Sequence, residues 1–241
     1  MKRILDIVCS FFGLVLLSPL LIPVMILVWL QDFHSPFYVA PRVGKNERIF
    51  SMVKLRSMIM GADKSGVDST SANDTRITGV GHFVRKFKLD EFTQLWNVLK
   101  GDMSLVGPRP NVRRETDLYT SVEKKLLSIK PGITDFSSIV FSDENDILKD
   151  SQDPDIDYNQ LIRPWKSRLG LIYVENATVL LDISLIILTV SAIFSRGIAL
   201  LGVNKLLNIV EAPQDVIRIS KRIDRLVPFP PPGTDKIVTS R

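Results

Sequence analysis

The longest apolar run in the chain covers residues 4–30, where Asp6 is the one charged residue. At about 1.5 Å per residue, a straight helix of this length could cross a bilayer. Ser18, Pro19 and Pro23 interrupt the run, and each proline removes a backbone donor and bends a helix. Each half is too short to cross alone. We therefore predict a re-entrant membrane helix hairpin over residues 1–33, broken at Ser18 and Pro19.

Positive charge flanks this segment on both sides. Lys2 and Arg3 precede it, and several basic residues follow it, namely Arg42, Lys45, Arg48, Lys54 and Arg56. Positive residues stay on the cytoplasmic side of a membrane, so this pattern favours a segment with both ends on that side. A single helix that spans the bilayer is the alternative.

Two short patterns after the apolar run predict a β-hairpin. Residues 37–40 and 47–55 are rich in β-branched and aromatic residues, and a turn-rich connection separates them. Lys54 and Arg56 alternate with apolar neighbours, so they share one face of the second strand. Either this face is simply solvated, or the two cations face phosphate groups.

The clearest helical pattern lies over residues 89–99. Its apolar residues recur at helical spacing and form one face: Leu89, Phe92, Leu95, Trp96 and Leu99. Gly101 ends the helix, as glycine commonly does at a helix C-terminus. Asp90 and Glu91 lie at its start, where free backbone amides and the helix dipole favour ionised carboxylates.

A stiff loop follows this helix. Pro108 and Pro110 fix the backbone on either side of Arg109. An acidic pair, Asp90 and Glu91, one short helix away from a rigidly held arginine suggests a metal and phosphate site.

The remaining patterns predict further helices and a flexible end. Amphipathic helices are expected over residues 115–130, 158–173 and 215–226, and an apolar helix too short for a confident span over residues 180–194. The helices at about 158–205 suit the membrane interface, although a buried core helix is the alternative for residues 180–194. Residues 61–78 read as a surface loop, and proline-rich residues 227–241 as disordered.

These elements predict an α/β, mostly helical fold. A re-entrant helix (1–33) precedes a compact cytosolic catalytic domain with a small sheet (34–210), and an amphipathic helix and a tail end the chain (211–241).

Composition narrows the classes of partner. The 241 residues carry a net charge of +5, with a pI of about 9.3, which favours anionic partners such as lipids or phosphorylated substrates. No compact basic run interleaves with aromatic residues, so nucleic acid is not expected. The single cysteine, Cys9, permits no intrachain disulfide.

The stretch around the acidic pair resembles a known family. Its Leu89-Asp90-Glu91 sequence, the helix that follows and the run from Lys100 to Pro110 resemble the bacterial sugar transferases, specifically the monotopic phosphoglycosyl transferases. The likeness covers about residues 5–187. It weakens after Thr134, where many relatives continue Gly-Trp-Ala-Gln-x-x-Gly-Arg and this chain has residues 135–142 of a different sequence.

This resemblance implies roles for several residues. Asp90 would be the nucleophile, and Glu91 would hold Mg²⁺, with Asp90 as a further candidate ligand. Arg109 and Arg85 would bind phosphate oxygens, although Arg85 read alone is a surface arginine. A Lys-x-Arg segment such as Lys54 and Arg56 would lie near the active site, while Asn97 and Asp102 either support it or cap the helix.

The resemblance also implies a reaction and a location. Such an enzyme moves a sugar-1-phosphate from a UDP-sugar to a polyprenyl (undecaprenyl) phosphate and releases UMP, through a covalent aspartyl intermediate. It acts on the cytoplasmic face of the bacterial inner membrane. A membrane-anchored scaffold without catalysis is the alternative, although a scaffold has no need of the intact pair Asp90 and Glu91.

Overall fold

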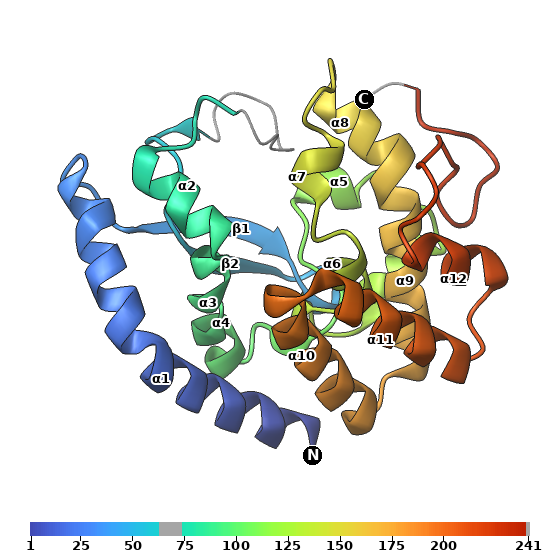
Figure 1. Ribbon diagram of the computed structural model, residues 1–241, viewed down its shortest axis with the longest axis horizontal. Coiled ribbons are helices and arrows are strands. Elements are labelled where there is room, and N and C mark those ends of the chain that lie inside the picture. The colour runs from blue at the N-terminus through green and yellow to red at the C-terminus, as the bar shows by residue number, and fades with distance from the viewer. Residues whose placement is uncertain (63–73, 240–241) are drawn as a thin grey trace.

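The computed structural model describes residues 1–62 and 74–239, and within them the fold is mostly helical with two small sheets (Figure 1). Most of the loop predicted over residues 61–78 lies outside the described residues. The helices are α1 (Lys2–Leu30), α2 (Gly79–Lys86), α3 (Leu89–Phe92), α4 (Leu95–Lys100), α5 (Arg113–Thr116), α6 (Phe136–Val140), α7 (Glu144–Ile147), α8 (Pro154–Asp157), α9 (Arg163–Asn176), α10 (Val179–Phe194), α11 (Arg196–Ile209) and α12 (Gln214–Ser220). The strands are β1 (Phe37–Val43), β2 (Ile49–Leu55), β3 (Ser104–Val106) and β4 (Gly132–Thr134), with short 3₁₀ turns η1 (Lys45–Glu47) and η3 (Glu123–Ser128) and the π-helical turn η4 (Tyr158–Ile162).

Helix α1 runs without a break through the residues expected to divide it. Pro19 cannot donate to the carbonyl of Val15, four residues earlier. The hydroxyl of Ser18 donates to that same carbonyl at 2.8 Å, so the freed acceptor keeps a partner. The expected pair of helices folded back at Ser18 and Pro19 is therefore absent from the described chain. A single curved helix occupies residues 2–30 instead (Figure 1).

Both ends of α1 are attached to the body of the protein. At the first end, Lys2 Nζ lies 2.6 Å from Asp182 Oδ2 on α10. Just after the other end, Arg56 Nη2 donates to Asp32 Oδ1 at 2.7 Å. The inner face of α1 packs in between, against residues such as Leu55 and Val84.

Two glycines let strands β3 and β4 meet. These strands pair in parallel, and β3 leads directly into the Pro108–Pro110 loop. A Cβ on Gly107 would lie 2.6 Å from the carbonyl oxygen of Lys130, and one on Gly132 would lie 2.1 Å from the amide nitrogen of Gly107. Side chains at these two positions would push the loop away from β4.

The predicted hairpin is confirmed as the antiparallel pair β1 and β2, and α10 confirms the helix over residues 180–194. Other predicted helices are shorter or divided. The helix over residues 89–99 becomes α3 and α4, and at the junction the backbone amides of Gln94 and Trp96 donate to the carbonyls three residues earlier, those of Glu91 and Thr93. The helix over residues 115–130 becomes α5 and η3, that over residues 158–173 becomes η4 and α9, and that over residues 215–226 shortens to α12.

The tail differs from the expected disorder. Residues 227–239, the described part of the tail, form no regular secondary structure, yet Phe229 stacks on Trp165 of α9, with ring centroids 4.5 Å apart. Arg168 donates to the carbonyl of Pro230 at 2.9 Å, and Gln160 donates to that of Val238 at 2.7 Å. Several contacts along α9 and η4 thus hold the proline-rich segment in place.

Candidate active site

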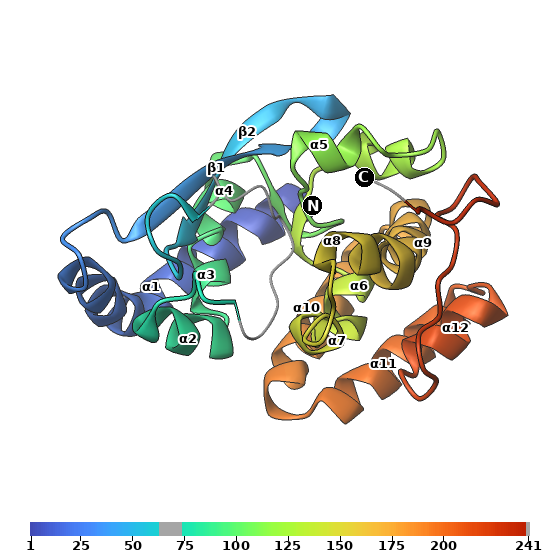
Figure 2. The same ribbon diagram turned by 90° about the horizontal axis from the view of Figure 1, so that it is seen from above.

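A pocket of about 360 Å³ lies between two halves of the molecule. Figure 2 shows α1–α4 and the β1–β2 hairpin on one side, and α6–α12 on the other. Lining residues come from both halves, among them Lys54, Asp90 and Arg109 at one end and Asp135 and Lys166 at the other.

The acidic pair lies at the start of α3. Lys88, in the left-handed conformation with φ of 52°, turns the chain from α2 into α3. Asp90 Oδ2 then lies 3.9 Å from Lys54 Nζ, and Glu91 Oε1 lies 2.9 Å from Arg109 Nη2. The two neighbouring carboxylates thus have different cations beside them.

These surroundings separate the two acids electrostatically. Desolvation raises the pKa of Asp90, although Lys54 counteracts it, and Glu91 adds to the rise. Desolvation also opposes ionisation of Glu91, but Arg109 and Lys54 outweigh it and lower the pKa of Glu91 to about 2. Glu91 is therefore a firm anion, whereas burial works against the ionised form of Asp90 that the helix start favours.

The cations around the pair are themselves partly desolvated. Desolvation lowers the pKa of Lys54 and of Arg85, and Asp90 opposes both shifts. The Glu91 carboxylate raises the pKa of Arg109. The Nε of Arg85 donates to Ser57 Oγ at 3.0 Å, which aims this side chain into the pocket wall rather than leaving it on the surface.

Most residues expected at the site do come together in this pocket: Lys54, Arg85, Asp90, Glu91, Pro108, Arg109 and Pro110. Arg56 is not among the described residues that line it. Its side chain is 5% exposed and binds Asp32 and the carbonyl of Ser35 instead. β2 ends at Leu55, so Arg56 lies beyond the strand whose alternation linked it to Lys54.

Asn97 has a structural position. Its amide nitrogen donates to the carbonyl of Ser51 at 2.7 Å, and its oxygen accepts from the amide of Val53 at 2.9 Å. It therefore holds β2 against α4. Asp102 lies beside it and pairs with Lys100 at 3.3 Å.

Sequence reasoning missed several residues that line the pocket, among them Arg42, Asp135, Ser138, Glu144 and Lys166. One signal for Asp135 was available, because Asp-x-x-Ser before an apolar run is typical of a helix start, and Asp135 does cap α6. Lys166 was recognisable only as part of the polar face of a helix. Nothing local indicated that this face turns toward the pocket.

The donor set fits Mg²⁺ bound together with substrate. Within residues 1–62 and 74–239, no three His, Cys, Asp or Glu side chains are placed to hold a metal. Asp90 and Glu91 nevertheless offer two hard carboxylate oxygens in a pocket rich in cations for phosphate. Mg²⁺ is usually bound by one or two carboxylates plus substrate phosphates and waters, so a full protein cage is unnecessary.

The chain is similar to known proteins over most of its length. The family model described as "Bacterial sugar transferase" matches residues 1–196. The chain is 36% identical over 214 residues to the undecaprenyl-phosphate galactose phosphotransferase of Salmonella typhimurium, which covers 81% of this chain and 41% of that protein. It is 33% identical to the exopolysaccharide production protein ExoY of Sinorhizobium fredii, over 81% of this chain and 87% of that protein.

A third relative names a nucleotide sugar. The UDP-N-acetylgalactosamine-undecaprenyl-phosphate N-acetylgalactosaminephosphotransferase of Aeromonas hydrophila is 30% identical over 80% of this chain and 44% of its own length. The chain thus spans about two fifths of the length of the Salmonella and Aeromonas proteins. The match over residues 1–196 includes the Asp90–Glu91 pair and the Pro108–Pro110 loop, and the chain belongs to the bacterial sugar transferase family.

Proposed function

We propose that this protein transfers a sugar-1-phosphate from a UDP-sugar to undecaprenyl phosphate or a similar polyprenyl phosphate, with release of UMP. The observation that carries the proposal is one pocket in which Asp90 and Glu91 meet Lys54, Arg85 and Arg109. Three cationic side chains can balance the negative charge of a diphosphate, and a carboxylate among them is a suitable nucleophile. The printed names of the Salmonella and Aeromonas relatives support the donor and the lipid acceptor.

In the first step, a carboxylate oxygen of Asp90 attacks the phosphorus that bears the sugar. The bond from that phosphorus to the bridging oxygen breaks, and UMP leaves with the oxygen and its electron pair. Asp90 then carries the sugar-1-phosphate as an acyl phosphate. Lys54 and Arg109 neutralise the phosphate oxygens, so that an anionic nucleophile can approach.

In the second step, a phosphate oxygen of the polyprenyl phosphate attacks the same phosphorus. The bond to Asp90 breaks, the free carboxylate returns, and the product is a polyprenyl diphosphate sugar. Glu91, with Asp90 as a further candidate, would hold Mg²⁺, which when bound withdraws charge from the diphosphate.

The acceptor is a lipid, and the outer surface of the protein suits a membrane. α1 is the one helix of the described chain long and apolar enough to cross a bilayer. Its outward residues are exposed, as are those of α10 and α11; for example, Leu16 is 79% exposed and Phe194 is 85% exposed. Large exposed apolar surfaces of this kind usually contact lipid or protein.

The attachment of both ends of α1 to one body supports a re-entrant topology. If α1 lies in the membrane, Lys2 and Asp32 must both stay on the side that holds their partners, Asp182 and Arg56. We place that side in the cytoplasm because basic residues flank both ends. The site then faces the inner membrane surface, at the depth of a polyprenyl phosphate headgroup.

Topology is testable by thiol labelling in a Cys9→Ala background. One variant has a cysteine inserted after Met1, and the other carries His34→Cys. Both should resist an impermeant reagent added outside the cell and react once the membrane is opened. Labelling of only one of the two from outside would mean a spanning helix.

The activity is tested with purified protein, Mg²⁺, polyprenyl phosphate and a panel of UDP-sugars. Release of UMP that depends on both the UDP-sugar and the lipid is expected. Failure to release UMP with every donor, from protein whose circular dichroism shows it folded, would contradict the proposal and favour the scaffold alternative.

A further inference from the structure

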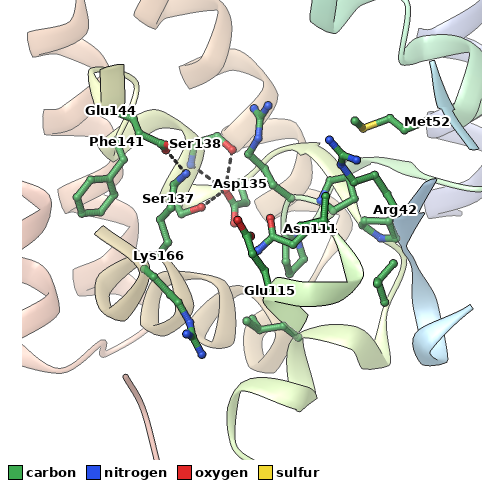
Figure 3. Close-up of a pocket in the computed structure, with 18 of the residues that line it drawn as sticks. Arg42, Met52, Asn111, Glu115, Asp135, Ser137, Ser138, Phe141, Glu144 and Lys166 are labelled. Carbon is green, nitrogen blue, oxygen red and sulfur yellow. Dashed lines mark hydrogen bonds and ion pairs between the residues drawn. The ribbon is translucent and has the colours of Figure 1, made fainter. Parts of the chain in front are cut away.

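The pocket has two chemically different ends. The end at Asp90 is rich in cations, whereas the opposite wall carries Asp135, Ser138, Glu144 and Lys166 from α6, α7 and α9. Figure 3 shows Asp135, Ser137, Ser138, Glu144 and Lys166 gathered on one side of the pocket, away from Arg42 and Met52. This second group, Asp135, Ser138, Glu144 and Lys166, is called the acceptor wall because its carboxylates accept hydrogen bonds. The name does not refer to the lipid acceptor.

Asp135 leaves one oxygen of the acceptor wall without a partner. Its side chain is fixed, because Oδ1 accepts from Ser137 Oγ at 2.7 Å, from the Ser138 amide at 2.8 Å and from Ser138 Oγ at 2.9 Å. Oδ2 has no hydrogen-bond partner among the described residues, although Asp135 is only 1% exposed. A buried carboxyl oxygen without a donor is costly, which points to a donor supplied by a ligand.

Glu144 and Lys166, the other charged members of the wall, line the same pocket. Lys166 Nζ forms an ion pair with Glu144. Desolvation raises the pKa of Asp135, and the hydrogen bonds from Ser137 and Ser138 and the charge of Lys166 oppose that rise. Glu144 in turn acts on Arg109 through space. Asp135 Oδ2 and Pro108 Cβ each lie 3.9 Å from the position that a Cβ on Gly170 would take, so a ligand whose phosphates lie at Arg109 has Asp135 within reach of its next group.

The chemistry of the wall suits a ring that carries hydroxyl groups. Carboxylates accept hydrogen bonds and cannot donate them, whereas the Lys166 ammonium can donate. The one O–H of Ser138 already donates to Asp135, so the Ser138 oxygen can accept from a ligand. A sugar hydroxyl both donates and accepts, so such a ring can bond to all four side chains. A negatively charged sugar would instead bring its own carboxylate close to two others.

The donor offers two hydroxyl-bearing rings, the transferred sugar and the ribose of the nucleotide. The ribose is common to all UDP-sugars, whereas the printed names of the Salmonella and Aeromonas relatives give different sugars, galactose and N-acetylgalactosamine. The wall is assigned to the sugar rather than to the ribose, and binding of UMP tests that choice.

On the basis of the proposed transferase function, we propose that Asp135, Ser138, Glu144 and Lys166 bind the transferred sugar and select a neutral, hydroxyl-bearing one. Asp135 Oδ2 and Glu144 accept hydrogen bonds from ring hydroxyls. Lys166 holds Glu144 in position for this contact.

The test compares Asp135→Asn and Glu144→Gln with Asp146→Asn. Asparagine at position 135 can still cap α6, but a donor replaces the free acceptor in one orientation of the amide. Asp146 is exposed on α7, next to Glu144 in the fold but outside the pocket lining, so its variant is a matched control. Binding of UDP-glucose, UDP-galactose, their N-acetylamino forms and UDP-glucuronate is measured by titration calorimetry, together with binding of UMP.

We expect wild type to bind a neutral UDP-sugar more tightly than UDP-glucuronate. Asp135→Asn and Glu144→Gln should weaken binding of that preferred donor about tenfold to a hundredfold, because a hydrogen bond to a charged group is lost. Both variants should also discriminate less between the neutral donor and UDP-glucuronate. UMP affinity should stay within about twofold, and Asp146→Asn should match wild type.

Two results would overturn the proposal. If UMP binding weakens as much as donor binding, the wall holds the nucleotide. If discrimination is unchanged in both variants, with normal thermal unfolding, the wall is only structural. Calorimetry needs no turnover, so a wild-type protein that binds donors selectively yet releases no UMP would count against the proposed reaction and not against this wall. If Asp135→Asn fails to fold, Glu144→Gln still decides.

Discussion

Two arginine–glutamate pairs line or adjoin the same pocket, and their surroundings differ sharply. Arg163 and Glu123 are almost completely buried, with side chains 6% and 0% exposed. Arg163 contacts both carboxylate oxygens, at 3.1 and 2.7 Å, and also donates to Asn159. Ser167 and the amide of Thr120 donate to the same carboxylate, so the pair has many partners.

Arg109 and Glu91 have far fewer partners. Their side chains are 30% and 22% exposed, and they share one contact of 2.9 Å. In the described part of the chain, Glu91 is the one polar partner that the guanidinium of Arg109 contacts within hydrogen-bond distance. A guanidinium has five N–H donors, so most of those on Arg109 stay available.

We call Arg163–Glu123 the closed pair and Arg109–Glu91 the open pair. The difference between them separates a structural role from a chemical one. A pair whose donors and acceptors are used up can fix helices but cannot take a ligand. A pair with spare donors beside a ready nucleophile can receive phosphate oxygens. The number of unused hydrogen-bonding groups thus distinguishes the two pairs better than charge or proximity to the pocket.

The largest expected effect is on the nucleophile beside the open pair. Asp90→Asn should lower turnover by at least about a thousandfold, because an amide cannot form the acyl phosphate. Wild type mixed with UDP-sugar alone should release about one UMP per site in a burst, and intact-protein mass spectrometry should find a sugar-phosphate adduct on Asp90. The variant should show neither. Asp117→Asn, at an exposed residue of the pair with Arg113, is the control.

An adduct on Glu91 would exchange the roles of the two acids. A fully active Asp90→Asn enzyme would exclude the covalent mechanism.

The second prediction exchanges arginine for lysine in each pair. Arg109→Lys should lower kcat/KM about a hundredfold, because one ammonium cannot replace a forked donor on phosphate. The free energy of unfolding should change little. Arg163→Lys should instead lower the free energy of unfolding by about 2 kcal/mol, because Glu123 and Asn159 lose partners in a buried site. Activity assays and thermal unfolding of both variants check this. The same loss of stability in both would erase the distinction between the pairs.

The sequence placed Asp90, Glu91 and Arg109 in one candidate site, but it predicted neither the Arg109–Glu91 ion pair nor the Arg163–Glu123 ion pair. Asp90, Glu91 and Arg109 lie within one local stretch, and proline and helix-end signals describe how each is held. Glu123 and Arg163 are 40 residues apart in the chain. Their contact depends on how η3 packs against α9, which no local pattern encodes.

Tertiary contacts that no local pattern encodes also explain the other differences between prediction and structure. Alternation put Lys54 and Arg56 on one face, but β2 ends between them and Asp32 draws Arg56 away. Proline content suggested a disordered tail, yet the contact between Phe229 and Trp165 is tertiary. The β1–β2 hairpin and α10 were predictable, because each follows from its own residues.

The third prediction concerns pH and the nucleophile. Activity requires ionised Asp90, whose pKa desolvation raises, so the acid limb of kcat/KM should lie above the usual range for aspartate. Lys54, Arg85 and Arg109 oppose that rise and Glu91 adds to it. Lys54→Met removes the nearest cation, so the acid limb should move to higher pH by about one unit. Lys45→Met, outside the pocket lining, should leave the profile unchanged. A shift to lower pH would contradict this view of the site.

The smallest expected effect tests what the open pair contributes to stability. Desolvation opposes ionisation of Glu91, but Arg109, with Lys54 and Lys88, lowers the pKa of Glu91 from 4.5 to about 2. A carboxyl whose pKa is lower in the folded state stabilises that state above its unfolded pKa, and the contribution is lost as pH falls through the folded value. The difference in thermal midpoint between wild type and Glu91→Gln should therefore be constant above about pH 5 and shrink as the pH approaches 2.

Glu175→Gln, on an exposed part of α9, provides the baseline. Because the open pair keeps contact with solvent, the whole effect should stay near 1 kcal/mol, below the loss in Arg163→Lys. A difference that grows as the pH falls would mean that Glu91 is not held as an anion by Arg109, and the contrast between the two pairs would then need another explanation.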